Sequence, residues 1–495
     1  MKKLLKSPYL WPLLGVLVAS RLLVLLSMLW LAPNVSIAYL NLQQPHSLGV
    51  SDLMGRPVVV EARSPDHQPH SLSYTFAGCP SATIEVTGLR QYELRSCPQA
   101  EQPRQLTLEV APKLQVFYAG LAAMGAGQGN LLWLQFAKLD LQSQAAVHTL
   151  SLHELKPLER LLHSVYNWDA RWYLSIARFG YFYNERLLGA QQYTNAAFYP
   201  LLPFLGRGLA FLTGLPPELT LLGMVQVLAV VAGVLLFRLA LLMRLQPSAA
   251  FASVVLYALF PTSFFLSLPY TESLYITLSL LVFLNLENRW APLAAALSVL
   301  ARSTGIVHMP VLLLQTRGDW RQRLQRGLVA GLGLVAFATW LGATVKDPLA
   351  FVHAQQAWKE PMRPGNHWQH LLDALLLGPV VRLGNWIQHS PWSWASLNLV
   401  VAVLVLVTLF TGYQLIPKPL RLYTLLSLAL PYFTFASSRV EMLSFGRFAL
   451  AAYPLFLVWG QWLSPHPRLL ATLVGLAILL LARLSADFGA GAFLG

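Results

Sequence analysis

Apolar segments about as long as a membrane is thick recur throughout this chain of 495 residues. A helix needs about 20 consecutive apolar residues to cross the hydrocarbon core of a bilayer. Such segments predict crossings at residues 8–32, 218–243, 249–268, 273–288, 291–314, 327–345, 393–415, 421–437, 445–463 and 467–485. Residues 197–214 form either another crossing or a re-entrant helix. The predicted fold class is a polytopic α-helical membrane protein with about 10–12 transmembrane helices.

Composition and charge agree with this class. Only 11% of the residues are charged, whereas a soluble domain carries about 25%. The cations behind the net charge of +14 gather in short segments beside the apolar ones, as at residues 2–6, 317–326 and 418–421. Short loops rich in Lys and Arg stay on the cytoplasmic side of a membrane. We therefore expect membrane lipids and no nucleic acid as partners, with the N-terminus inside and residues 34–166 outside.

The first apolar run, within residues 1–33, lacks a convincing signal-peptidase site, so we expect a retained transmembrane helix. Residues 34–160 are far more polar and contain runs that alternate between apolar and polar residues, at 57–62, 82–87, 105–110 and 146–152. Period-two alternation indicates half-buried strands. We predict an inserted extracytoplasmic β-sandwich-like domain, which either binds carbohydrate or acts as a spacer or assembly domain.

The two cysteines of the chain, Cys79 and Cys97, both fall in this external segment. Extracytoplasmic compartments permit disulfides. We therefore predict a Cys79–Cys97 disulfide; the alternative is a pair of unpaired thiols in a reducing compartment.

Residues 165–181 combine one acid, Asp169, with Trp168, Trp172 and Tyr173. An amphipathic segment rich in aromatic and basic residues suits a membrane–water interface, because each side chain has an apolar body and a polar end. We predict an interfacial helix here. Its aromatic side chains either stack on a sugar or polyprenyl chain or only anchor the helix.

At this point the sequence resembles a known family. The run 168–181 looks like the signature of the PIG-V mannosyltransferases, which add the second mannose to the glycosylphosphatidylinositol anchor, and of their prokaryotic relatives. Matching pieces follow in order at residues 195–203, 260–275, 301–305, 347–355 and 445–456. The resemblance covers roughly residues 160–465, and the chain departs from the family pattern by the long insertion before the signature.

The resemblance implies a GT-C-like membrane glycosyltransferase, a hexosyltransferase that moves mannose from a polyprenyl-phosphate donor to a lipid or glycan acceptor. It implies a catalytic transmembrane domain over residues 161–495, in a bacterial inner membrane, with its site on the extracytoplasmic face. No cofactor is expected, because the lipid-linked sugar is a substrate.

This chemistry assigns roles to two residues. An acceptor hydroxyl must lose its proton as it attacks the anomeric carbon, and a carboxylate can serve as the general base. Asp169 is the predicted base; alternatively it caps its helix or pairs with Arg171 or Arg178. The leaving phosphate needs positive charge, which Arg supplies with planar, bidentate donors. Arg302, embedded in an apolar run, is the predicted phosphate ligand; alternatively it forms a structural ion pair.

Four further residues are candidates for binding the donor phosphate or sugar: Glu272, His353, Arg439 and Arg447. Glu272 orients the sugar, pairs with Arg302, or is a helix-start carboxylate favoured by the helix dipole. The two arginines bind phosphate, snorkel to the interface or pair with Glu441. His353 bonds the donor or is an exposed loop residue. Counting crossings from the basic loops places these residues on the same face as Asp169, with residues 197–214 and 291–314 each forming a re-entrant segment or a pair of short helices.

Other classes of function are less favoured. Local sequence offers no cluster of metal ligands and no Gly-rich phosphate loop, so we expect neither a metal nor a nucleotide. The main alternative is a transporter or flippase of lipid-linked saccharides, which often shows repeated halves that this sequence lacks. A third interpretation is a scaffold acting through the external β-domain.

Overall fold

The computed structural model describes residues 7–30, 35–39, 47–50, 58–63, 68–76, 79–86, 89–94, 105–110, 115–122, 133–142, 146–154, 156–181, 195–355, 394–434 and 444–491. The chain divides into two compact units. One comprises residues 1–24 and 168–484, and the other comprises residues 25–167 and 485–493.

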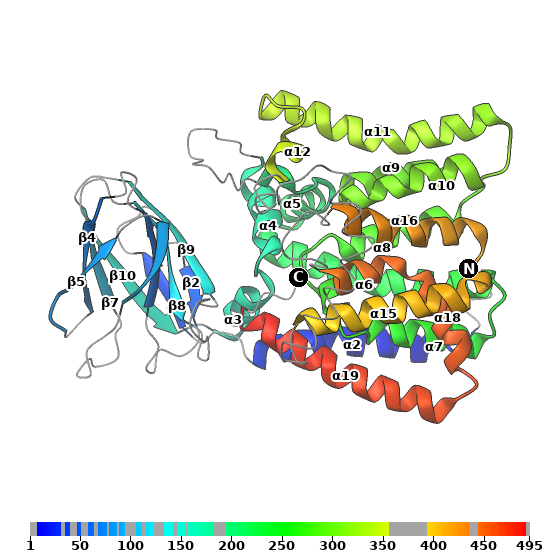
Figure 1. The fold of residues 1–495 in the computed structure, drawn as a ribbon, viewed down its shortest axis with the longest axis horizontal. Helices are drawn as coiled ribbons and strands as arrows, with labels where there is room; N and C mark the ends of the chain where they lie inside the picture. Colours follow the sequence, from blue (N-terminus) through cyan, green and yellow to red (C-terminus); the bar gives the residue numbers. More distant parts are fainter. Residues whose placement is uncertain are drawn as a thin grey trace. The chain divides into compact units, whose positions relative to one another are not determined.

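The described part of the chain is mostly helical (Figure 1). Its helices are α2 (Leu10–Trp30), α3 (Pro157–Val165), α4 (Asp169–Phe179), α5 (Leu201–Thr213), α6 (Pro217–Leu242), α7 (Pro247–Ala258), α8 (Glu272–Leu284), α9 (Trp290–Ala301), α10 (His308–Gln315), α11 (Trp320–Thr344), α12 (Ala350–Gln355), α15 (Trp394–Gly412), α16 (Lys418–Thr434), α17 (Phe445–Ala449), α18 (Pro454–Leu463) and α19 (Pro467–Gly489). Short 3₁₀ helices, among them η2 (Asn195–Ala197), η3 (Ser263–Ser267) and η4 (Ser303–Val307), connect several of them.

Four of the described helices, α2, α6, α11 and α19, are long and apolar enough to cross a membrane. The chain is thus an integral membrane protein, as the sequence predicts. The other apolar helices of the described residues, at positions of further predicted crossings, are shorter. With 12 residues, α9 for example is about 18 Å long, against about 30 Å of hydrocarbon.

The shortening has a local cause. The predicted crossing 249–268 is α7 followed by a turn and η3, and Pro261 and Pro269 lie on either side of η3. Proline lacks the N–H that a helix interior needs. The predicted crossing 291–314 is α9, η4 and α10, which together run beside α11 (Figure 1). Apolar composition predicted the length of these segments but not their breaks.

The second unit contains the strands. They are β1 (Val35–Tyr39), β2 (Ser47–Val50), β3 (Val58–Arg63), β4 (His70–Phe76), β5 (Ala82–Val86), β6 (Leu89–Leu94), β7 (Gln105–Val110), β8 (Gln115–Ala122), β9 (Trp133–Gln142) and β10 (Ala146–Glu154). They form a six-stranded sheet in the order β2-β1-β10-β7-β4-β5 and a four-stranded sheet in the order β6-β3-β8-β9. The four alternating runs of the sequence are all strands.

Every strand pairing in these sheets is antiparallel. The first strand pairs with the last, with Val35 opposite Glu154. The strands therefore begin and end side by side, as in a domain inserted into another chain segment. Stacking of the two sheets into a sandwich remains a prediction. So does the Cys79–Cys97 disulfide, because Cys97 lies outside the described residues.

The core of the first unit lies around α8, which packs against α6 and α9. Residues 262–280, comprising η3, the following turn and most of α8, are all buried. A buried stretch of this length must satisfy its polar groups internally. It carries Glu272, and the polar partners of that carboxylate define the candidate site.

Candidate active site

Four side chains from four different segments form a chain in which carboxylates and guanidinium groups alternate. Nη1 of Arg447 donates to Oδ2 of Asp169 over 2.7 Å. Nε of Arg447 donates to Oε1 of Glu272, and Nη1 of Arg302 donates to the same oxygen. The order is Asp169, Arg447, Glu272 and Arg302, which we call the ionic quartet.

Exposure changes along the quartet. The side chain of Glu272 is 3% exposed, that of Arg447 10%, that of Arg302 14% and that of Asp169 27%. Buried charges require paired and hydrogen-bonded partners. Glu272 is the buried centre, whereas Asp169 and Arg302 at the two ends are the more exposed members.

One carboxylate oxygen of the quartet lacks a hydrogen-bond donor among the described residues. Oε2 of Glu272 is buried and accepts no hydrogen bond from the described residues. An unsatisfied buried carboxylate oxygen costs free energy, because it has lost its water without a replacement. A hydroxyl or amide donor of a bound molecule can supply the missing hydrogen bond.

Two members of the quartet follow a strained residue. Asp169 is the first residue of α4, and the Trp168 before it has φ 53° and ψ −124°. Ser444 has φ 60° and precedes α17, which carries Arg447. Non-glycine residues adopt positive φ at a cost of about 1–3 kcal/mol and persist there only where the surroundings enforce it. The backbone is thus held in costly conformations just where it turns towards the site.

Arg302 owes its position to the break between α9 and η4. It terminates α9 in an extended conformation, with φ −161° and ψ 147°. Gly305 packs so closely against the preceding helix that an added Cβ would lie 2.4 Å from the carbonyl of Ser298. His308, which is fully buried, bonds Gly305 O and Ser298 Oγ through Nδ1 at 3.0 Å each. Its Nε2 lies 2.9 Å from Ser279 Oγ on α8, so the imidazole ties Arg302's segment to Glu272's helix.

Aromatic rings line both guanidinium groups. Cζ of Arg447 lies 4.5 Å from the ring centre of Tyr270 and 5.2 Å from that of Phe265. Cζ of Arg302 lies 5.1 Å from the ring centre of Phe448. Cation–π contacts of this kind strengthen when the cation is desolvated. The rings also restrict the orientation of each fork of N–H donors.

The predicted aromatic residues of α4 pack on the segment around η2. Trp172 stacks on Phe198 with 5.8 Å between ring centres, and Tyr173 meets the same ring edge-on at 5.3 Å. Burial, and after it the charges of Asp169 and Glu272, raises the pKa of Tyr173 to about 12. This phenol is therefore protonated at neutral pH.

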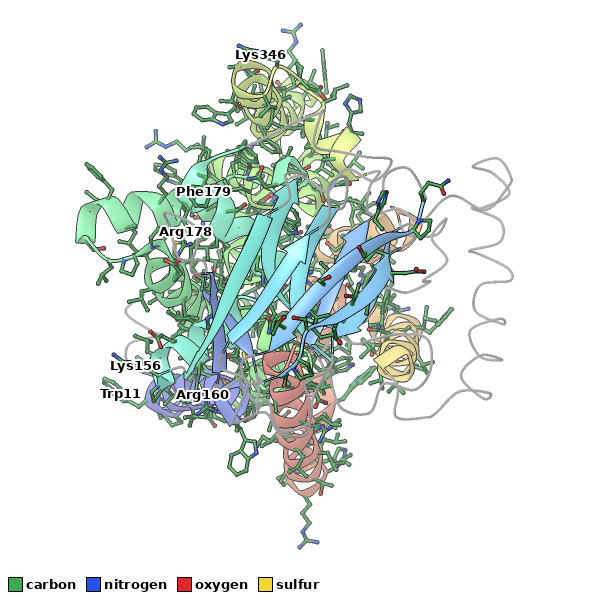
Figure 2. All side chains as sticks on the ribbon, turned by 90° about the vertical axis from the view of Figure 1, so that its left-hand side faces the viewer. Trp11, Lys156, Arg160, Arg178, Phe179 and Lys346 are labelled. Atoms are coloured by element: carbon green, nitrogen blue, oxygen red, sulfur yellow. The ribbon has the colours of Figure 1, made fainter. Side chains whose placement is uncertain are left out.

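The other end of α4 is fastened to α6. Arg178, labelled beside Phe179 in Figure 2, forms an ion pair with Glu218 in the first turn of α6. Asp169, at the start of the helix, pairs with Arg447. The helix is held at both ends, which fixes the direction of its first residue.

Not every predicted site residue joins the quartet. Nδ1 of His353 lies 2.8 Å from Oδ2 of Asp347, and its side chain is 48% exposed, but the residue belongs to the short helix α12 and not to a loop. Arg439 lies outside the described residues. Sequence reasoning missed His308, although a histidine inside an apolar run is itself a signal. No group of three or more His, Cys, Asp or Glu in the described part of the chain is arranged to hold a metal ion.

A comparison with known protein families matches a segment that contains three of the four quartet residues. The model of the mannosyltransferase (PIG-V) family matches residues 142–357. This segment contains Asp169, Glu272 and Arg302, while Arg447 lies beyond it. No curated protein matches the chain.

Two solved structures resemble the chain at low identity. Both are crystal structures of the oligosaccharyltransferase of Archaeoglobus fulgidus, one in the apo form and one tethered with an acceptor peptide. The apo form has 14% identity and a TM-score of 0.36, covering 67% of this chain and 54% of that chain. The tethered form has 13% identity and a TM-score of 0.36, covering 68% and 51%. The chain spans about half the length of these proteins. Residues 142–357 of this chain are thus similar to the mannosyltransferase (PIG-V) family, as the resemblance of the sequence motifs implies.

Proposed function

We propose that this protein is a membrane hexosyltransferase with a GT-C-like catalytic domain. In this proposal it moves mannose from a polyprenyl-phosphate donor to a hydroxyl of a lipid or glycan acceptor on the extracytoplasmic face. The family match supports the transferase class. The observation that carries the proposal is the ionic quartet, in which an accessible carboxylate and an accessible guanidinium flank a buried pair.

Asp169 is the general base of the proposed reaction. The acceptor oxygen attacks the anomeric carbon while the bond from that carbon to the donor phosphate breaks. The hydroxyl proton passes to Asp169, and polyprenyl phosphate leaves. The Arg447 hydrogen bond occupies Oδ2, which leaves Oδ1 to accept the proton. One displacement of this kind inverts the anomeric centre.

Arg302 holds the leaving phosphate. It shares one carboxylate oxygen with Arg447, whereas Arg447 contacts two carboxylates. Arg302 therefore has more N–H donors to give, and a guanidinium suits a phosphate because its donors bind two oxygens at once. The free Oε2 of Glu272 accepts a hydroxyl of the transferred sugar, which orients the donor between the two ends of the quartet.

Transfer by the purified protein tests the proposal. The full chain in lipid nanodiscs is incubated with polyprenyl-phosphate mannose, with other polyprenyl-phosphate hexoses and with a panel of lipid and glycan acceptors. We expect transfer with inversion, detected by mass spectrometry and by the anomeric configuration of the product. No transfer from any lipid-linked sugar, together with movement of such lipids across the bilayer, would replace the transferase by the transporter.

Two substitutions separate the roles. Asp169→Asn keeps the shape of the side chain and removes the base, so we expect kcat to fall by about 10²–10⁴-fold with little change in donor affinity. Arg302→Gln should weaken donor binding first. Glu287→Gln, in the turn after α8, and Arg321→Gln, near the start of α11, are matched controls at exposed positions and should retain activity. Full activity of Asp169→Asn would refute the assignment of the base.

A further inference from the structure

A fifth buried charge lies in the first helix, outside the quartet. Arg21 is in the middle of α2, one of the helices long enough to cross a membrane, and is 5% exposed. Among the described residues no carboxylate pairs with it. An unpaired cation at such a place is costly and marks function more often than chance. The helix packs closely against α6 here. Leu17, one turn before Arg21, lies so near Gly233 of α6 that a Cβ added to this glycine would be 2.3 Å from the leucine side chain.

All five N–H donors of Arg21 are used. Nη1 donates to Ser263 O over 2.9 Å and to Ser267 Oγ over 3.0 Å. Nη2 donates to Ala258 O over 2.8 Å and to Ser263 Oγ over 3.4 Å. Nε donates to the neighbouring Ser20 Oγ over 3.3 Å. A guanidinium has five such donors, so Arg21 has none left for a ligand.

Four of these five bonds reach one short segment, residues 258–267, which contains the end of α7, the following turn and η3. The carbonyl of Ala258 is one of those that a helix end leaves without an internal partner. The same segment is held from a second side, because Gln226 Nε2 of α6 donates to Ser267 O over 2.7 Å. Arg21 therefore replaces the backbone hydrogen bonds that the broken crossing has lost.

This segment also sets the position of Arg447. Thr262 Oγ1 donates to Gly446 O over 2.8 Å, which fixes the residue next to Arg447. Phe265 of η3 presents its ring to the Arg447 guanidinium at 5.2 Å. Tyr270, a few residues further, lies at 4.5 Å from it. A shift of the segment would move the backbone of α17 and the wall behind the guanidinium together.

We propose that Arg21 is a positioning residue that acts through residues 258–267 to hold Arg447 between Asp169 and Glu272. Its effect on catalysis rests on the proposed function, whereas its effect on the segment does not. Lysine cannot replace it, because an ammonium has three donors and no planar fork with which to reach acceptors on both sides. The first helix is in this way part of the catalytic unit and not only an anchor.

Hydrogen exchange tests the structural half of the proposal without any substrate. In the full chain in nanodiscs, Arg21→Lys and Arg21→Gln should lose protection in peptides covering 259–272 and keep it in α11. Arg238→Gln is the matched control, since it removes an arginine from the long helix α6 at an exposed position. Unchanged protection at 259–272 overturns the proposal. So does equal loss throughout the helices, because Arg21 would then be a general stabilising residue.

Kinetics test the catalytic half. We expect both variants to lower kcat by about tenfold to a hundredfold with donor KM within about twofold, because a displaced catalytic group loses rate steeply. Ser267→Ala removes one hydrogen-bond acceptor of Arg21 and leaves the other acceptors in place. It should lower the protection of residues 259–272 and kcat in the same direction as the Arg21 variants, but by less. This variant keeps the proposal testable if the Arg21 variants fail to fold. A normal kcat in Ser267→Ala and both Arg21 variants contradicts the proposal. If the unaltered protein transfers no sugar, the proposed function fails and hydrogen exchange still decides the role of Arg21.

Discussion

Arg447 donates a 2.7 Å hydrogen bond to Asp169, although 278 positions separate the two residues. The same guanidinium donates to Glu272, 175 positions away. One buried cation thus faces two acids, and it lies between the most exposed carboxylate of the quartet and the most buried one. The hydrogen bonding and the charge environment of the proposed base therefore depend on a residue of a different helix.

Replacing Arg447 alone should destabilise the protein more than replacing Arg447 and Glu272 together. Arg447→Gln leaves two carboxylates without their cation, and breaking a buried pair in this way costs about 3–5 kcal/mol. The double variant Arg447→Gln with Glu272→Gln removes the most buried uncompensated charge and should recover part of the loss. Thermal unfolding in nanodiscs measures both, with Arg321→Gln as the exposed control. Strictly additive effects would contradict coupling between the two residues.

Gly305→Ala should displace Arg302. The added Cβ would lie 2.4 Å from the backbone of Ser298, and backbone cannot move aside as a flexible side chain does. We expect a loss of about 1–3 kcal/mol, as in other overpacked sites, and weaker donor binding. Gly223→Ala in α6 is the control, because nothing lies within 4 Å of its added Cβ. Equal stability and donor affinity in the two variants would show that the break at η4 tolerates a side chain.

Ser444→Gly should preserve or raise stability. Ser444 has φ 60° and ψ 17°, a left-handed conformation that costs a non-glycine residue about 1–2 kcal/mol. Glycine adopts it freely, and the carbonyl of residue 444 still accepts from the N–H of Arg447. Ser444→Val, whose branched Cβ worsens the strain, is the opposite test. Unfolding temperatures of the three proteins should rank Gly at least equal to Ser, and Ser above Val.

Tyr173 predicts a dependence of stability on alkaline pH. Its pKa is raised to about 12 in the folded protein, against about 10 in an unfolded chain. Folding favours the protonated phenol, so its stabilisation is complete below about pH 10 and is lost as the pH approaches about 12. Between about pH 9 and pH 12 the unfolding temperature of Tyr173→Phe should fall less than that of the unaltered protein. Parallel curves would mean that this phenol titrates normally.

His353→Ala should have little effect on transfer. Its hydrogen bond goes to Asp347, and the side chain is about half exposed. Exposed pairs of this kind contribute about 0–1 kcal/mol. We expect kcat and donor KM within about twofold of the unaltered protein, with Asp347→Asn behaving alike. A loss of donor affinity in His353→Ala alone would restore this residue to the donor site.

Local sequence patterns predicted many of the helices and strands. Alternation at 105–110 and 146–152 predicted strands β7 and β10, because a strand exposes opposite faces in turn. Apolar length predicted the four long helices, because a bilayer imposes it. The aromatic run around Trp168 predicted a helix over residues 165–181, and α4 occupies Asp169–Phe179 of that range. These features depend on neighbours within a few residues, which the sequence presents directly.

The breaks in the apolar segments were less visible. Residues 291–314 have the composition of one crossing, yet they divide at Arg302 because Gly305 and His308 close a turn against Ser298. Hydropathy averages over such a turn. A histidine and a glycine within an apolar run are the signals that would have indicated it.

The sequence by itself determined that this is a membrane protein with a β-rich insertion and a segment typical of mannosyltransferases. It also supplied the acids and arginines from which the site is built. Only the tertiary structure decided that Arg447 bridges Asp169 and Glu272, that Arg302 shares that bridge, and that Arg21 is bound to the loop behind it. The reason is physical: a buried charge takes whichever partner packing brings within reach, and packing joins segments that no local pattern relates.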